Sequence, residues 1–165
     1  MTGPPSKSAV FLSRVAIALL VALIVLGFAW YGSSPEVSER IWKNILARPG
    51  GPMTFRFILQ PTMAAIAALR DGVKDAREGR SPYFWAIVHV SGERAGRLNE
   101  GMISTARIVL LGIVMDTIYQ YIELNTFYPG EAALIALLLA FIPYLLLRGP
   151  IARFERRRIA QRTST

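Results

Sequence analysis

One uninterrupted apolar run, residues 15–31, constrains this chain more than any other feature. It holds 17 residues without a charge, and apolar residues just before it extend the predicted helix to residues 9–31. At about 1.5 Å per residue, a helix of about 20 residues crosses the roughly 30 Å hydrocarbon layer of a bilayer. Trp30 and Tyr31 end the run, which is typical of aromatic side chains at a membrane–water boundary. We therefore expect a transmembrane helix here.

A cleaved signal peptide is the competing interpretation of this run. The apolar region of a signal peptide usually spans 7–15 residues and ends at a small-x-small motif. This run is longer, and Ala29-Trp30-Tyr31 does not fit that motif, although Gly32-Ser33-Ser34 does. We expect a retained membrane anchor.

The composition agrees with a membrane protein and excludes several chemistries. The chain is 53% hydrophobic and only 18% charged, whereas a soluble domain is about 25% charged. It has no cysteine and one histidine, which excludes a disulfide framework, a zinc ribbon and a cysteine nucleophile. It also lacks a glycine-rich phosphate loop and the HExxH and GxSxG motifs. We expect no catalytic residue, no metal and no cofactor, and a protein that is not an enzyme.

Residues 102–122 and 131–147 are the other clear spanning candidates. The first holds nine Leu, Ile and Val residues and an acid, Asp116, which costs about 3 kcal/mol near the centre of a membrane helix. The second is nearly pure Ala, Leu, Ile and Phe, with an expected kink at Pro143. The loop between them is short, so we expect the two helices to pack antiparallel.

Residues 53–78 form an amphipathic pattern whose relation to the membrane stays open. Large apolar residues share one helical face and polar residues share the other. The cost of inserting Arg56 balances the gain from the large apolar residues, so residues 53–69 either cross the membrane or lie in its plane. Ala64 and Ala68 match the small-xxx-small pattern of close helix contacts.

Two shorter segments are expected at the membrane surface. Ser34-Pro35-Glu36 predicts the start of a helix whose apolar stripe suits the interface, and residues 48–52, which include two prolines and two glycines, end it. Residues 83–90 are apolar and aromatic but too short to span, so they predict an interfacial or protein-packed segment.

Basic residues predict the orientation. The tail, residues 148–165, holds six arginines and the loop at 123–131 holds none, which places the tail in the cytoplasm. If residues 53–69 cross, there are four spans and the N-terminus is inside; if they do not, there are three and it is outside. The sequence thus predicts an all-α integral membrane protein, a single unit over residues 1–165, with three or four transmembrane helices, an interfacial amphipathic segment and a cytoplasmic basic tail.

Asp116 is the most informative polar residue. It shares a helical face with Tyr119 and Gln120. In the four-span arrangement Arg56 lies at the same depth as Asp116, which predicts an ion pair between them with Gln60 one turn away. This face is either an ion relay or substrate contact, or an interhelical contact that fixes packing.

The arginines of the tail are candidate contacts for anionic lipid headgroups, at about 1 kcal/mol each. They are Arg148, Arg153, Arg156, Arg157 and Arg158. Nucleic acid is not an expected partner, because these residues adjoin a spanning helix and no binding fold is recognisable. The expected partners are the lipid bilayer, its anionic headgroups, and other membrane proteins or further copies of the chain.

Three strings carry a resemblance to known sequences: FRFILQPTMAAIAALRDGVKDAREGRSPYFW at 55–85, MDTIYQ at 115–120 and FYPGEAALIALLLAFIPYLLLRGPIAR at 127–153. Together they resemble a group of small, uncharacterised bacterial inner-membrane proteins. The resemblance implies a compact helical unit in a bacterial inner membrane. It brings no catalytic or binding residues.

Three functions are compatible with these features. The first is a non-enzymatic structural or accessory component of a membrane assembly, since the chain lacks enzyme motifs and is smaller than the usual repeat-built transporter. The alternative is a small oligomeric transporter or channel that uses the Asp116 face. The third is a membrane enzyme acting on lipids through Asp71, Asp75 or Glu123, but these acids lie near basic residues and favour a solvated helix face.

Overall fold

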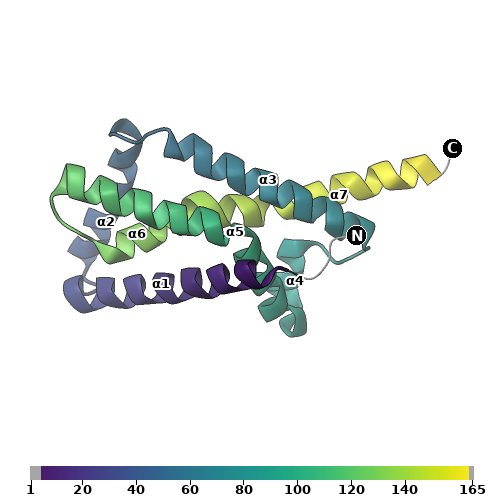
Figure 1. The fold of residues 1–165 in the computed structure, drawn as a ribbon, viewed down its shortest axis with the longest axis horizontal. Coiled ribbons are helices and arrows are strands. Elements are labelled where there is room, and N and C mark those ends of the chain that lie inside the picture. The colour runs from purple at the N-terminus through teal and green to yellow at the C-terminus, as the bar shows by residue number, and fades with distance from the viewer. Residues whose placement is uncertain (1–4, 164–165) are drawn as a thin grey trace.

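The structure, a computed structural model, describes residues 5–163, and every regular element in that range is a helix (Figure 1). The elements are α1 (Lys7–Tyr31), α2 (Pro35–Ala47), the 3-10 turn η1 (Arg48–Gly50), α3 (Arg56–Arg77), α4 (Tyr83–His89), α5 (Ser91–Tyr119), the π turn η2 (Gln120–Leu124), α6 (Pro129–Ala136), the π turn η3 (Leu137–Phe141) and α7 (Ile142–Thr163). Three helical rods are long and apolar enough to cross a membrane: Lys7–Tyr31, Ser91–Leu124 and Pro129–Arg162.

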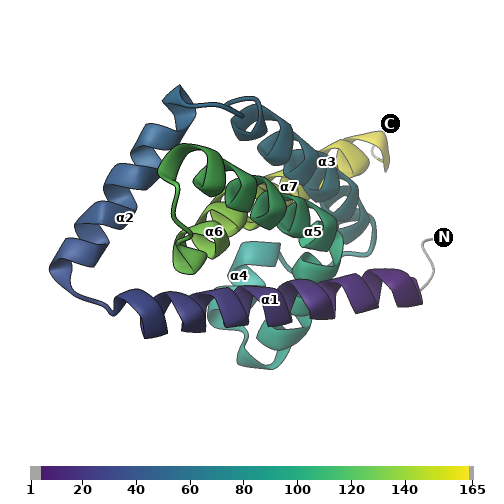
Figure 2. The ribbon, with the colours of Figure 1, turned by 60° about the vertical axis from the view of Figure 1, so that its left-hand side comes forward.

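The helices α1, α3 and α5 and the continuous rod α6–η3–α7 run along the long axis of the molecule (Figure 1). α1 and α5 run in one direction, and α3 and the continuous rod α6–η3–α7 run in the other (Figures 1 and 2). α2 crosses one end of this bundle, which we call the α2 end, and α4 lies at the other, the α4 end. The start of α1 and the end of α7 therefore both lie at the α4 end.

α1 ends at the predicted Tyr31 but begins at Lys7, two residues before the predicted start, and α2 begins and ends where the sequence predicts. Ser6 caps α1 by accepting a hydrogen bond from the Ala9 amide at 3.2 Å. Ser34 caps α2 in the same way, with Pro35 at the first helical position, where its missing N–H costs nothing. α2 ends at Ala47, directly before the turn of prolines and glycines, which confirms the predicted stop.

Two helices extend beyond the predicted spans. α5 begins at Ser91, so the polar residues before 102 are part of the same helix. The basic tail continues the last rod as α7, up to Thr163. Instead of a simple kink at Pro143, the π turn η3 precedes the proline; a wide turn accommodates a ring that cannot donate a hydrogen bond to the carbonyl four residues earlier.

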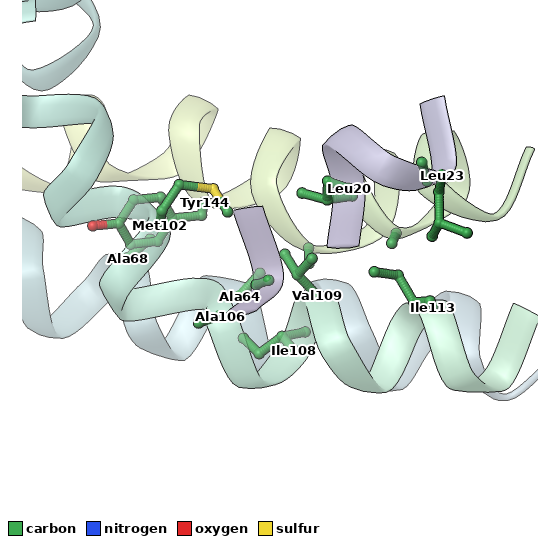
Figure 3. Packing of buried hydrophobic residues seen from close by; sticks show 14 of the residues in the cluster. Leu20, Leu23, Ala64, Ala68, Met102, Ala106, Ile108, Val109, Ile113 and Tyr144 are labelled. Atoms are coloured by element: carbon green, nitrogen blue, oxygen red, sulfur yellow. The ribbon is translucent and has the colours of Figure 1, made fainter. Parts of the chain in front are cut away.

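The middle of the bundle is a layer of small and apolar side chains from all four rods (Figure 3). α3 contributes Ala64 and Ala68, α5 contributes Ala106 and Val109, and α1 contributes Leu20; all are at most 6% exposed. Small residues let helix backbones approach closely, as in membrane helix bundles. The small-xxx-small pair of α3 thus lies in the core, between the two ends of the bundle.

α3 presents its polar and small residues inward and its large apolar residues outward. Arg56 and Gln60 are fully buried, whereas Ile58, Ile66 and Leu69 are 72%, 47% and 52% exposed. This is the reverse of a surface helix in a soluble protein, whose apolar stripe faces the core. The large apolar side chains of α3 therefore form part of the outer surface of the bundle.

Candidate functional site

The first group of buried polar side chains lies at the α2 end. It comprises Arg48, Arg56, Asp116, Gln120 and Glu131, and we call it the Asp116 cluster. Each of these side chains is 0% or 1% exposed. They come from η1, α3, α5, η2 and α6, so the cluster joins elements far apart in the sequence.

Arg48 is the central cation of the Asp116 cluster. Its Nε lies 2.9 Å from Asp116 Oδ1 and its Nη2 lies 3.3 Å from Asp116 Oδ2. The same Nη2 donates to Glu131 Oε2 at 3.0 Å. A guanidinium that bridges two carboxylates in this way gives strong, directional, charge-assisted hydrogen bonds.

The predicted Arg56–Asp116 ion pair is present. Arg56 Nη2 lies 3.0 Å from Asp116 Oδ1, while no side-chain nitrogen of Arg56 has a hydrogen-bond partner among residues 5–163. The Arg56 guanidinium also lies 4.8 Å from the centre of the Tyr119 ring. Arg56 is thus held by charge and by the aromatic face. Gln60 is buried nearby but donates to Met115 Sδ, at 3.8 Å, rather than joining the ion pair.

Gln120 and Glu131 connect the Asp116 cluster to the surrounding turns. Gln120 donates to Asp116 Oδ2 at 2.7 Å and accepts from the Tyr128 amide at 2.6 Å. Glu131 accepts from Asn44 at 3.0 Å, so α2 is tied to the start of α6. The predicted residues Arg56, Asp116, Tyr119 and Gln120 therefore do come together.

A second group, the Asp75 cluster, lies at the α4 end and comprises Asp75, Arg80, Arg97, Glu100 and Arg148. Arg148 grips Asp75 with two hydrogen bonds, from Nε at 2.8 Å and from Nη2 at 2.9 Å. Arg97 Nη1 donates to Asp75 Oδ1 at 3.1 Å. Arg80 Nη2 donates to Glu100 at 2.6 Å, and this hydrogen bond raises the pKa of the Arg80 guanidinium, which keeps it charged.

The Asp75 cluster corrects two predictions. Arg148 is 2% exposed and paired inside the bundle, so its assignment to lipid headgroups is wrong. Asp75 is fully buried and does not belong to a solvated helix face. Of the other tail arginines, Arg153, Arg157 and Arg158 are exposed. Arg156 is half-buried and donates to the Arg80 carbonyl.

Hydroxyl groups extend the Asp75 cluster towards the middle of the bundle. Tyr144 and Ser104 each donate to Asp71 Oδ2 at 2.6 Å, and Arg148 donates to the Tyr144 hydroxyl at 2.7 Å. Tyr83 donates to the Arg97 carbonyl at 2.7 Å. Burial raises the pKa of Tyr83 to about 12, so this hydroxyl stays protonated and keeps donating.

The two clusters are separated by the apolar middle layer. Ser104 and Asp116 belong to different clusters, and 12 residues of α5 place them about 18 Å apart. Among residues 5–163, no group of three or more histidines and carboxylates is placed to hold a metal ion. The carboxylates of both clusters are occupied by guanidinium groups, an arrangement that joins helices to one another.

Sequence reasoning missed Arg48 and Glu131, which belong to the Asp116 cluster as fully as Arg56 does. Comparison with known proteins adds no further residues, because no family model, curated protein or solved structure matches this chain.

Proposed function

We propose that this chain is a non-enzymatic structural or accessory component of a membrane assembly in a bacterial inner membrane. One observation carries the proposal: the buried carboxylates at both ends of the bundle are paired with arginines of other helices, and an apolar layer separates the two ends. Residues paired in this way fix packing. They are not poised for proton transfer or substrate turnover.

The outward face of α3 supports four membrane crossings. α3 runs the length of the bundle beside α7, and its exposed residues Ile58, Ile66 and Leu69 suit contact with lipid (Figure 1). Its buried Arg56 pairs with Asp116 of α5, as the four-crossing arrangement predicts. In this arrangement both the start of α1 and the end of α7 lie in the cytoplasm.

The exposed arginines support the same orientation. Arg14 of α1 and Arg70 of α3 are exposed at positions towards the α4 end, as are Arg153, Arg157 and Arg158 of α7. From Arg14 to Trp30 is about 24 Å along α1, close to the thickness of a hydrocarbon layer. Basic residues gathered at one boundary favour the cytoplasmic side for the α4 end.

A flux measurement tests the proposal against the transporter alternative. The purified protein is reconstituted into lipid vesicles, and proton flux and ion flux under a membrane potential are recorded with dyes. We expect the wild type and Asp116→Asn to match empty vesicles. A flux through the wild type that Asp116→Asn abolishes would overturn the proposal in favour of a small oligomeric transporter using the Asp116 face.

Photo-crosslinking in cells tests the assembly role directly. The outward side of α1 carries large exposed apolar residues, among them Val25 at 59% exposed. A photoreactive residue at position 25 should form crosslinks to a membrane protein of fixed mass, or to a second copy of the chain. The control is the same residue at position 154, which is 64% exposed near the end of α7. Crosslinks to lipid alone at position 25 would contradict an assembly role.

A further inference from the structure

A pocket of about 220 Å³ opens between α1, α2 and α6 at the α2 end. Its walls are mainly apolar, with Ile24 and Phe28 from α1, Ile41 from α2 and Leu134 from α6. Figure 2 shows how α2 leaves the end of α1 and crosses this end of the bundle. Of the two polar clusters, only Glu131 of the Asp116 cluster lines the pocket; Arg48, Asp116 and the Asp75 cluster do not.

The pocket has a firm boundary where α1 meets α6. A Cβ atom on Gly27 would lie 2.8 Å from the backbone nitrogen of Gly130, so the two helices touch backbone to backbone there. Tyr31 is held over the same region, since its hydroxyl donates to the Phe127 carbonyl at 2.9 Å. On this side the pocket is therefore bounded by two closely packed helices.

A cationic side chain, Arg40, lines this apolar pocket. Its guanidinium lies 4.7 Å from the centre of the Tyr31 ring and 4.2 Å from that of Tyr128. The nearest carboxylate, that of Glu131, is 3.7 Å from Arg40 Nε, too far for a hydrogen bond, and already accepts from Asn44 and Arg48. Arg40 Nε has no hydrogen-bond partner among residues 5–163. This Nε is buried, but the Arg40 side chain as a whole is 30% exposed, so an anion can approach the guanidinium from outside.

We propose that this pocket binds an anionic phospholipid of the outer leaflet, with one acyl chain along the apolar walls and the phosphate at Arg40. The inference rests on the membrane placement proposed above, which puts Tyr31 and Tyr128 at the outer boundary between hydrocarbon and headgroups. The combination of an apolar groove and a single cation at its rim is complementary to a charged headgroup that adjoins an acyl chain. A second copy's helix, about 10 Å across, fits a space of this size less well.

Lipid photo-crosslinking tests the proposal. The full chain is reconstituted into vesicles of equal parts phosphatidylglycerol and phosphatidylcholine, with a trace of one lipid or the other carrying a photoreactive acyl chain. We expect the phosphatidylglycerol probe to label peptides from the pocket walls, residues 24–41 and 130–137, well above the phosphatidylcholine probe.

Two pairs of variants sharpen the test. Arg40→Gln removes the cation and should lower pocket labelling about tenfold, whereas Lys43→Gln removes an exposed cation of the same helix and should not. Ile41→Trp fills the pocket and should abolish labelling, whereas Leu46→Trp, at a site 75% exposed on α2, should leave it unchanged. Circular dichroism and thermal unfolding confirm that each variant is folded.

The results separate the lipid site from the function proposed above. Equal labelling by both probes, or labelling that Arg40→Gln leaves intact, would overturn the anionic site while leaving the assembly role untouched. Crosslinks from a photoreactive residue placed at a pocket wall to a second copy of the chain would overturn it too, because a second copy would then occupy the pocket. If the chain stays dissolved without detergent, the membrane placement itself fails, and with it both proposals.

Discussion

Asp116 holds two arginines at once, one from η1 and one from α3. With Glu131 as the second acid, the buried charges of Arg48, Arg56, Asp116 and Glu131 sum to zero. A buried ion pair contributes little net stability over an apolar replacement, but removal of one partner leaves a charge with no counter-charge. The cluster therefore adds little to the stability of the fold, yet the loss of any one of its charges is strongly destabilising.

Asp116→Asn should lower the free energy of unfolding by about 3–5 kcal/mol, because two buried guanidinium groups would then share one carboxylate. The measurement is unfolding in mixed detergent micelles, followed by circular dichroism. Glu123→Gln, which neutralises an exposed acid one turn beyond the cluster, is the control and should change the free energy by less than about 0.5 kcal/mol. Equal losses for both variants would contradict the cluster's structural role.

Arg148→Gln should also destabilise the protein by about 3–5 kcal/mol, since Asp75 would lose its two-fold hydrogen-bonded partner inside the bundle. Arg158→Gln, at an exposed site of the same helix, should be close to neutral in the same unfolding experiment. If the Arg148 variant instead loses only binding to anionic vesicles and keeps its stability, the residue serves lipid contact after all.

Only part of this residue-level pattern can be read from the sequence. Arg56 and Asp116 are predictable because each lies within an apolar stretch, so depth along the helix matches them. Arg48 stands next to Pro49 and Gly50, a context that normally marks a solvated turn, and nothing in its neighbours signals burial. Asp75 stands beside Lys74, which suggests a pair of surface residues. The Lys74 side chain is indeed partly exposed, but the Asp75 side chain is fully buried.

At the scale of the helices, the contact between α3 and α7 depends on one missing side chain. A Cβ on Gly72 would lie 2.9 Å from the Arg148 carbonyl oxygen and 2.9 Å from Ile151 Cγ2. α7 would have to move away from α3 to admit it. Because Arg148 also pairs with Asp75 of α3, such a shift would weaken the Asp75 cluster as well.

Gly72→Ala should therefore destabilise the protein by about 1–3 kcal/mol, as expected when a packed contact is overfilled. Gly96→Ala in α5 is the matched control, since a Cβ there meets nothing within 4 Å. That change should stabilise the helix by about 0.5–1 kcal/mol through the lower entropy of the unfolded chain. Thermal unfolding of both variants measures these changes in stability. A Gly72→Ala variant as stable as the wild type would show that α7 can move away from α3 without loss of stability.

The helices themselves are the most predictable level of this structure. Apolar runs and cap residues correctly predicted the positions of α1 and α2, and the antiparallel pairing of α5 with α6 followed from their short loop. The inward face of α3 is harder to predict, because its repeat of small and polar residues resembles the solvent-exposed face of a surface helix. Which face points inward depends on the surrounding solvent, and the sequence pattern alone does not specify the solvent.

For the whole molecule, the proposed arrangement predicts which loops can be reached from each side of the membrane. The chain has no cysteine, so single cysteines can be introduced cleanly. Ser38→Cys and Thr126→Cys, exposed at the α2 end, should react with an impermeant maleimide on intact cells. Ser8→Cys and Ser91→Cys, exposed at the α4 end, should react only after the membrane is opened.

Labelling of Ser8→Cys and Ser38→Cys from the same side would contradict four crossings, because α1 would no longer separate them. Labelling of Ser91→Cys but not Thr126→Cys on intact cells would keep the crossings and reverse their direction. All four positions are exposed, so whether the maleimide reaches them depends on the membrane and not on burial in the fold.

The spacing of the ion-pair partners along the chain has a consequence for biogenesis. Arg48 and its partner Asp116 are 68 residues apart in the sequence, and Asp75 and its partner Arg148 are 73 residues apart. While the ribosome is still making α5, Arg56 of α3 has no counter-charge, because its partner Asp116 has not yet been made, so α3 is not stable in lipid. We expect α3 to stay at the translocon until the C-terminal hairpin has been synthesised. A nascent chain truncated before residue 116 should be degraded by membrane proteases.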